Sequence, residues 1–145
     1  MKVGILFGSR SDTDKMKGAA RCLEEFGIEW QAHVLSAHRV PEELEKRLAA
    51  MKQEGVKVLI CGAGLAAHLP GVVASKTTMP VIGVPLTARI NGLDALYSIV
   101  QMPKPIPVAT VGIDNSFNAG MLAVEILAVG DDELAGKLEA WRENM

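Results

Sequence analysis

Residues 3–12, Val3-Gly4-Ile5-Leu6-Phe7-Gly8-Ser9-Arg10-Ser11-Asp12, join an unbroken apolar run to a short polar loop. An apolar run without alternation is typical of a strand that is covered on both faces of a parallel sheet. An amphipathic helical pattern follows the loop and ends at Gly27. This unit of strand, loop and helix predicts an α/β fold.

The same alternation continues along the chain. Further strands are predicted at 28–35, 56–61, 80–84 and 108–113. Further helices are predicted at 41–54, 68–75, 93–100, 116–129 and, as a short C-terminal helix, at about 131–143. We therefore expect one domain over residues 1–145. It should be a three-layer α/β/α sandwich around a parallel sheet of about five strands in the order 2-1-3-4-5.

Composition and charge restrict the function. The chain has 145 residues, 49% of them hydrophobic and 4% aromatic, and its formal net charge is −2. No basic stripe marks a nucleic-acid surface, and no apolar stretch reaches the ~20 residues that cross a bilayer. We therefore expect that the protein binds neither nucleic acid nor a membrane. Cys22 and Cys61 lie far apart, and no export signal precedes them. Free thiols and a cytoplasmic location are the expected result.

The carboxyl ends of parallel strands form the usual binding edge of such a sheet, so the loops there are the candidate site. In the first loop, the hydroxyls of Ser9 and Ser11 precede a helix and suit a phosphate monoester. Asp12 could accept hydrogen bonds from ribose hydroxyls. Simple helix capping by Ser11 or Asp12 explains the same residues equally well.

The second loop contains Ser36, His38 and Arg39 before Pro41 opens a helix. Histidine is the side chain best suited to proton transfer near neutral pH, and arginine can clamp a phosphate or carboxylate. The alternative is a structural histidine that caps the turn. His33, inside the second predicted strand, is expected to be structural or exposed.

The third loop, residues 62–71, is rich in glycine and alanine and includes Gly64, Ala66, His68 and Leu69. So compact and apolar a loop could close over a ligand and exclude water, although tight strand–helix packing also requires glycine. The three histidines and two cysteines show no metal-ligand spacing, so no metal is expected. Neither GxGxxG with a distal acid nor GxSxG is present.

Taken together, these loops resemble the class I PurE family of N5-carboxyaminoimidazole ribonucleotide mutases. The matching segments run in one order between about residues 3 and 128: Gly8–Asp12, Ser36–Pro41, Gly62–Gly71, Pro80–Pro85, Asn91–Asp94 and Ser98–Pro103. Leu65 stands where the family usually has glycine. If that position requires a positive φ angle, the loop is expected to take a different shape.

The resemblance implies a flavodoxin-like fold, a homo-octamer and no cofactor. It implies a phosphorylated imidazole ribonucleotide as substrate and a carboxylate transfer from an exocyclic nitrogen to a ring carbon in de novo purine biosynthesis. His38 matches the catalytic histidine and His68 the second histidine of the family. The implied substrate-binding residues are Ser9, Ser11, Asp12, Ser36, Arg39, Gly64, Ala66 and Leu69.

Two other functions remain open at this point. One is a class II carboxylase that joins free CO2 to aminoimidazole ribonucleotide, and the other is a module that senses a nucleotide without turnover. For the assembly, the apolar stretch Met121–Val124 is expected to exceed what one small domain buries.

Overall fold

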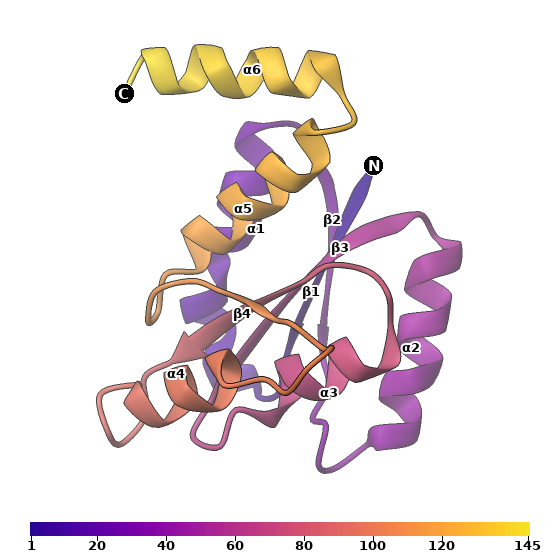
Figure 1. The fold of residues 1–145 in the computed structure, drawn as a ribbon, viewed down its shortest axis with the longest axis vertical. Helices are drawn as coiled ribbons and strands as arrows, with labels where there is room; N and C mark the ends of the chain where they lie inside the picture. Colours follow the sequence, from indigo (N-terminus) through magenta and orange to yellow (C-terminus); the bar gives the residue numbers. More distant parts are fainter.

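A computed structural model describes all 145 residues and contains a five-stranded sheet in the order β2-β1-β3-β4-β5 (Figure 1). Every neighbouring pair is parallel, which confirms the predicted flavodoxin-like arrangement. The strands are β1 (Lys2–Phe7), β2 (Glu29–Val34), β3 (Val56–Gly64), β4 (Val81–Leu86) and β5 (Ala109–Thr110). The helices are the 3-10 turn η1 (Arg10–Asp12), α1 (Thr13–Glu25), α2 (Pro41–Gln53), α3 (His68–Lys76), α4 (Leu93–Val100), α5 (Ser116–Ala128) and α6 (Asp132–Glu143).

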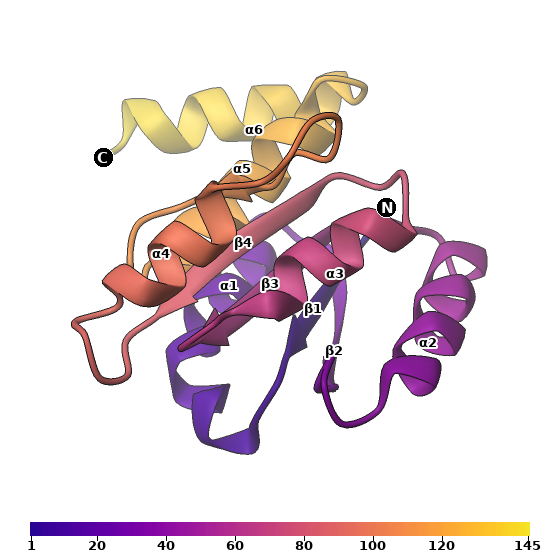
Figure 2. The ribbon, with the colours of Figure 1, turned by 60° about the horizontal axis from the view of Figure 1, so that its bottom comes forward.

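Helices cover both faces of the sheet and form two separate cores. Helices α1 and α5 pack on one face around Ile5, Val58 and Ile82. Helices α2, α3 and α4 cover the other face, around Leu6 and Leu59 (Figure 2). Because successive strand residues point to opposite faces, the unbroken apolar strands supply both cores, as their sequence predicts.

The last strand is much shorter than the predicted 108–113. Only Ala109 and Thr110 pair with β4, after which Val111 N–H donates to Gly83 O and Asp114 N–H donates to Pro85 O. The backbone N and O atoms of one strand residue point toward the same neighbouring strand. Because Pro85 O accepts from Asp114, the nitrogen of Pro85 also faces β5. Proline has no N–H to donate, and the ladder therefore ends.

The stretch Met121–Val124 does not form the excess apolar surface that its sequence suggests. Met121, Ala123 and Val124 are buried in the core between α1 and α5. Gly120 allows the two helices to approach closely, because a Cβ there would lie 2.7 Å from Cys22 Cβ. Close helix packing within one chain buries these residues, so they are no argument for an assembly.

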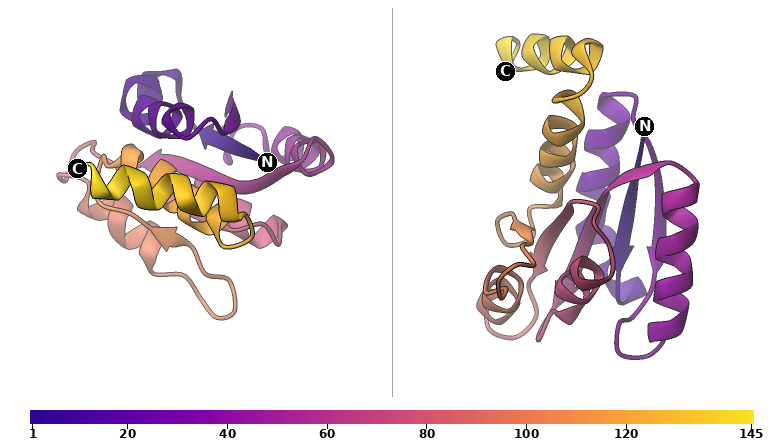
Figure 3. Two further views of the ribbon diagram at one scale, coloured as in Figure 1. Left: turned by 90° about the horizontal axis from the view of Figure 1, so that it is seen from above. Right: turned by 45° about the vertical axis from the view of Figure 1, so that its right-hand side comes forward.

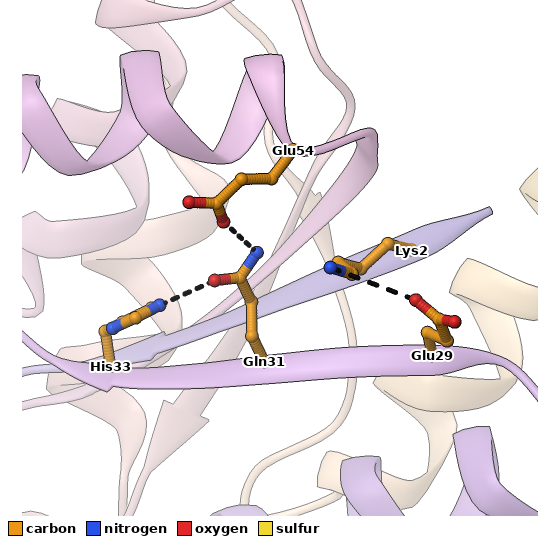
Figure 4. Close-up of polar contacts among 5 residues, drawn as sticks. All are labelled: Lys2, Glu29, Gln31, His33 and Glu54. Carbon is orange, nitrogen blue, oxygen red and sulfur yellow. Dashed lines mark hydrogen bonds and ion pairs between the residues drawn. The ribbon is translucent and has the colours of Figure 1, made fainter.

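Strand β2 is the exposed edge of the sheet, and polar side chains tie it to its neighbours (Figure 4). Gln31 Oε1 accepts a hydrogen bond from His33 Nε2 at 2.9 Å, and Gln31 Nε2 donates to Glu54, at the end of α2, at 2.8 Å. Lys2 of β1 pairs with Glu29 at 3.8 Å. His33 is thus a half-buried structural residue of this edge, as predicted.

Helix α6 lies across the end of α5, away from the sheet (Figure 3). Leu134 is buried in the first core, and Trp141 packs against Phe26, just after α1, with tilted rings whose centroids are 5.9 Å apart. Arg142 also pairs with Glu125 of α5. No helix of the structure has both the length and the apolar character that a membrane crossing requires.

Candidate active site

A cavity of about 490 Å³ lies where the carboxyl ends of β1, β2, β3 and β4 meet. Four loops supply its walls: Gly8, Ser9, Ser11, Asp12, Ser36, Ala37, His38, Ala63, Gly64, Leu65, Ala66, Ala67, His68, Leu69, Thr87 and Ala88. This is the edge at which the topology rule places a ligand, because the strand order reverses there. The cavity brings together all the predicted site residues except Arg39.

Two histidines from different loops meet at this cavity. His38 follows β2, and His68 is the first residue of α3, yet His38 Nε2 lies 2.6 Å from His68 Nδ1. The rings approach edge to face, with centroids 4.8 Å apart. A hydrogen bond between two imidazoles needs a protonated nitrogen on one ring and a free lone pair on the other. The pair can therefore hold one proton between two rings at the cavity wall.

In the first loop, Ser9 makes a side-chain helix cap and Asp12 does not. Ser9 caps η1, since its Oγ accepts from Ser11 N at 3.3 Å, and the two serine hydroxyls lie 2.8 Å apart. Asp12 stands at the N-cap position of α1 but makes no side-chain capping hydrogen bond. The capping explanation is thus wrong for Asp12, whose carboxylate is left for another partner at the cavity.

Asp12 shares its surroundings with two charged residues that the sequence analysis missed. Lys15 donates to the backbone carbonyl of Thr87, and Asp114 accepts from Thr87 N at 2.8 Å. Partial burial raises the pKa of Asp12, the positive charge of Lys15 opposes this rise, and the negative charge of Asp114 adds to it. Lys15 and Asp114 thus bind the carbonyl and the N–H of Thr87, which lines the cavity.

Arg39 does not line the cavity. It lines a separate recess at the end of the second loop and the start of α2, together with Val40, Pro41, Glu42, Glu43 and Lys46. Its backbone N–H donates to Ser36 Oγ at 3.3 Å, which holds the turn that carries His38. The predicted phosphate clamp is therefore adjacent to the cavity rather than in it.

The third loop contains two residues with left-handed backbone angles. Leu65 has φ of 55° and Ala67 has φ of 43°, and Ala67 N–H donates to Gly64 O at 2.9 Å to close the turn. For L-residues this conformation costs about 1–2 kcal/mol. The backbone at Leu65 therefore keeps the left-handed angle that glycine would take, and the loop does not change to a right-handed or extended conformation. Leu65 accepts the strained angle.

The remaining titratable groups near the cavity are few. No group of three or more His, Cys, Asp or Glu side chains is placed to hold a metal ion. Cys61, at the base of the third loop, is fully buried, and burial raises the pKa of its thiol well above the ordinary value. It is a core residue rather than a nucleophile.

The chain is similar to known proteins over almost its whole length. The profile of the AIR carboxylase family matches residues 2–145. An N5-carboxyaminoimidazole ribonucleotide mutase from Pyrococcus abyssi is 53% identical over 99% of this chain and 83% of its own length. A protein of the same name from Methanocaldococcus jannaschii is 55% identical over 97% of this chain and 88% of its own.

A solved structure, the crystal structure of Treponema denticola PurE, superimposes with a TM-score of 0.90 at 31% identity. The match covers 99% of this chain and 90% of that one. Sequence and fold therefore lead to one conclusion: the chain belongs to the AIR carboxylase family.

Proposed function

We propose that the chain is an isomerase that converts N5-carboxyaminoimidazole ribonucleotide into 4-carboxy-5-aminoimidazole ribonucleotide in de novo purine biosynthesis. The observation that carries this proposal is the His38–His68 pair, 2.6 Å apart at the wall of the cavity. The names of relatives that are about half identical over the whole chain support it.

The reaction needs one group that gives and then takes a proton. As the N5–carboxylate bond breaks, its electron pair returns to N5, CO2 forms and His38 protonates the amine. C4 then attacks CO2, a carbon–carbon bond forms, and His38 removes the proton of C4 so that the ring regains its aromaticity. The proton count closes without another reactant. His68, through its hydrogen bond, orients His38 for both steps.

The other wall residues would bind and orient the ribonucleotide. Ser9 and Ser11 lie at the start of η1 and α1, where backbone N–H groups and hydroxyls suit a phosphate. Asp12 suits the ribose hydroxyls. The small groups of Gly64 and Ala66, with Leu69, let the flat imidazole ring approach the backbone, and Ser36 supplies a hydroxyl beside His38.

Arg39 would reach the phosphate from the rim. Its side chain is exposed and follows the cavity residue His38 directly in the chain, which leaves it free to turn toward a bound anion. An arginine–phosphate pair is charge-assisted and often bidentate.

We also infer a homo-octamer in the cytoplasm. Helix α4 and the loop before it expose Ile90, Leu93, Tyr97 and Val100, a row of apolar side chains that another copy could cover. Cys22 and Cys61 are free thiols, which is typical of proteins from a reducing compartment.

The carboxylase reaction is the second candidate, because the matching family profile is named for it. Purified protein is mixed with N5-carboxyaminoimidazole ribonucleotide, or with aminoimidazole ribonucleotide plus bicarbonate, and the 4-carboxy product is followed by absorbance. We expect rapid product formation from the first substrate without bicarbonate. Turnover only with bicarbonate would establish the carboxylase, and binding without turnover of either would establish a nucleotide sensor.

A further inference from the structure

Thr87 is a cavity residue whose backbone is held by two charged side chains. It follows β4 directly and lines the cavity. Its N–H donates to Asp114 Oδ1 at 2.8 Å, and its carbonyl accepts from Lys15 Nζ. Neither Lys15 nor Asp114 is among the residues that line the cavity. Because the two hydrogen bonds fix the peptide groups before and after Thr87, they fix the position of this part of the wall.

The residue type at position 114 fits this contact. Asp114 has φ of 56°, in the left-handed region that most side chains avoid. Its N–H donates to Pro85 O at 2.9 Å, so its backbone and its side chain both bind the end of β4. Glycine would take this angle without strain but has no acceptor to offer Thr87. Among side chains with an acceptor oxygen, aspartate and asparagine tolerate the angle best.

Lys15 is held at its backbone as well as at its side chain. It is half-buried in the first turn of α1, and its carbonyl accepts from Ser116 Oγ, at the start of α5, at 2.6 Å. Its ammonium group forms no salt bridge and binds the Thr87 carbonyl instead. The start of α1, the end of β4 and the start of α5 are therefore connected at one residue of the cavity wall.

The charges of Lys15 and Asp114 also act on Asp12, which lines the cavity from the first loop. Thr87 and Asp12 therefore border the same part of the cavity, although they belong to different loops. In the proposed function, Asp12 binds the ribose hydroxyls of the substrate. The Thr87 hydroxyl can donate and accept hydrogen bonds, so it suits the same groups.

We propose that Lys15 and Asp114 are positioning residues for the substrate. They hold Thr87 beside Asp12 and so preform the part of the cavity that binds the ribose. This inference rests on the proposed mutase function, and it assigns the two residues to binding and not to proton transfer. A preformed wall need not be ordered when the substrate binds. Loss of either contact should therefore raise KM and leave kcat almost unchanged.

Two substitutions of Asp114 separate the hydrogen bond from the charge. Asp114→Gly allows the left-handed angle and removes the acceptor, whereas Asp114→Asn keeps the angle and an acceptor oxygen and removes only the charge. Loss of a negative charge near the cavity should by itself favour an anionic substrate. The electrostatic effect and the positioning effect of Asp114→Gly thus have opposite signs. Steady-state kinetics with N5-carboxyaminoimidazole ribonucleotide, at about pH 7.5, measures KM and kcat.

We expect Asp114→Gly to raise KM about fivefold, the usual effect of one hydrogen bond, with kcat within about twofold of the wild-type value. Asp114→Asn should have a KM no higher than wild type. Lys15→Met should also raise KM, whereas its matched control on α1, Lys17→Met, should not, because Lys17 pairs only with the exposed Asp14. Lys15 and Asp114 act through the same residue, so the double variant should raise KM by less than the product of the single effects.

A KM of Asp114→Gly at or below the wild-type value would overturn the inference. An equal rise in Asp114→Gly and Asp114→Asn would overturn it too, because the charge would then be the cause, and so would a fall in kcat without a rise in KM. Effects that multiply in the double variant would show that the two side chains do not act through Thr87.

Should Asp114→Gly fail to fold, as judged by circular dichroism, the comparison of Lys15→Met with Lys17→Met decides: equal KM values would overturn the inference. If the wild-type protein forms no product from this substrate, the proposed function itself fails, and the inference with it. Product formation by the wild-type protein, with KM unchanged in Lys15→Met and Asp114→Gly, defeats only the positioning role.

Discussion

At the scale of single residues, the proposed chemistry depends on His38. We expect His38→Asn to lower turnover by about 10²–10⁴-fold, the usual contribution of general acid–base catalysis. Folding and ribonucleotide binding should persist, because the side chain is exposed and lies outside both cores. Steady-state kinetics, with binding by calorimetry, measures both effects.

His33→Asn is the matched control, since His33 contacts Gln31 on β2 and does not line the cavity. It should leave turnover unchanged. More than roughly a tenth of wild-type activity in His38→Asn would exclude His38 from the acid–base role.

Lys15 provides a second test at this scale, because its charge opposes the burial that raises the pKa of Asp12. Removing the charge in Lys15→Met should raise the pKa of Asp12 further. Asp12 should then take up its proton at a higher pH, and substrate binding should weaken earlier on the acid side. NMR titration of the Asp12 carboxyl carbon measures the shift directly.

The control is Lys17→Met, which removes an equal charge that pairs with the exposed Asp14 at 2.5 Å. The Asp12 titration should be unaffected by it. An unchanged Asp12 titration in Lys15→Met would mean that Lys15 serves only to hold Thr87.

Residue types at strand ends were enough to place His38 and the serine loop at one edge of the sheet, but they predicted neither the contact between His38 and His68 nor the surroundings of Asp12. Lys15 and Thr87 lie 72 positions apart, and no local pattern connects them. For Arg39, the sequence showed that the residue lies beside His38. It did not show that the side chain lines a separate recess and not the cavity, because this depends on the turn that Ser36 stabilises.

At the scale of elements, the close packing of α1 on α5 depends on Gly120. A Cβ there would lie 2.7 Å from Cys22 Cβ and 2.9 Å from Ala19 O, so Gly120→Ala must push the helices apart. We expect it to destabilise the fold by about 1–3 kcal/mol. Urea denaturation measures the change in the free energy of unfolding.

Gly136→Ala is the control in the exposed part of α6, where no atom lies within 4 Å of the added Cβ. It should stabilise the fold by about 0.5–1 kcal/mol through the helix preference of alanine. Equal effects of the two substitutions would contradict the packing argument.

The edge strand β2 gives the fold a pH dependence. Burial lowers the pKa of His33 from 6.5, the nearby charge of Arg47 adds to this lowering, and Glu54 opposes it. Below about pH 6.5 the unfolded chain therefore binds the proton more readily than the folded chain, and stability falls as the pH decreases toward the lowered value. Denaturation at about pH 7.5 and about pH 5.5 should show this loss.

His33→Gln removes the titrating group and should reduce the difference in stability between these two pH values. The change should be modest, because the side chain is only half buried. An undiminished difference in His33→Gln would assign the acid sensitivity to other groups.

The bounds of a helix or strand could be predicted from the sequence where the residues that determine them lie within or next to that segment. Helix α4 has the predicted bounds, Leu93–Val100, because Gly92 and Gln101 flank a clear apolar pattern. Strand β5 was predicted too long because its end is determined by Pro85 on a different strand. Pairing across the sheet, unlike a helix cap, cannot be inferred from one segment alone.

At the scale of the whole molecule, the cavity and the exposed row on α4 are neighbours. Thr87 and Ala88 line the cavity, and the same loop continues to Ile90, which is 59% exposed. Tyr97, 60% exposed, lies one turn beyond Leu93 on α4. An assembly that covers this row would also fix the loop that forms one wall of the site, so assembly and activity should depend on each other.

The last prediction concerns this dependence. Light scattering at micromolar concentration should show an assembly of several copies, and Tyr97→Lys should dissociate it, because each interface would then bury an unpaired charge. Turnover should fall with dissociation, although Tyr97 does not line the cavity. Val129→Lys is the control: Val129 is 90% exposed but stands alone at the end of α5. It should change neither mass nor turnover. A wild-type monomer would contradict the octamer, and a Tyr97→Lys assembly of unchanged mass would place the interface elsewhere.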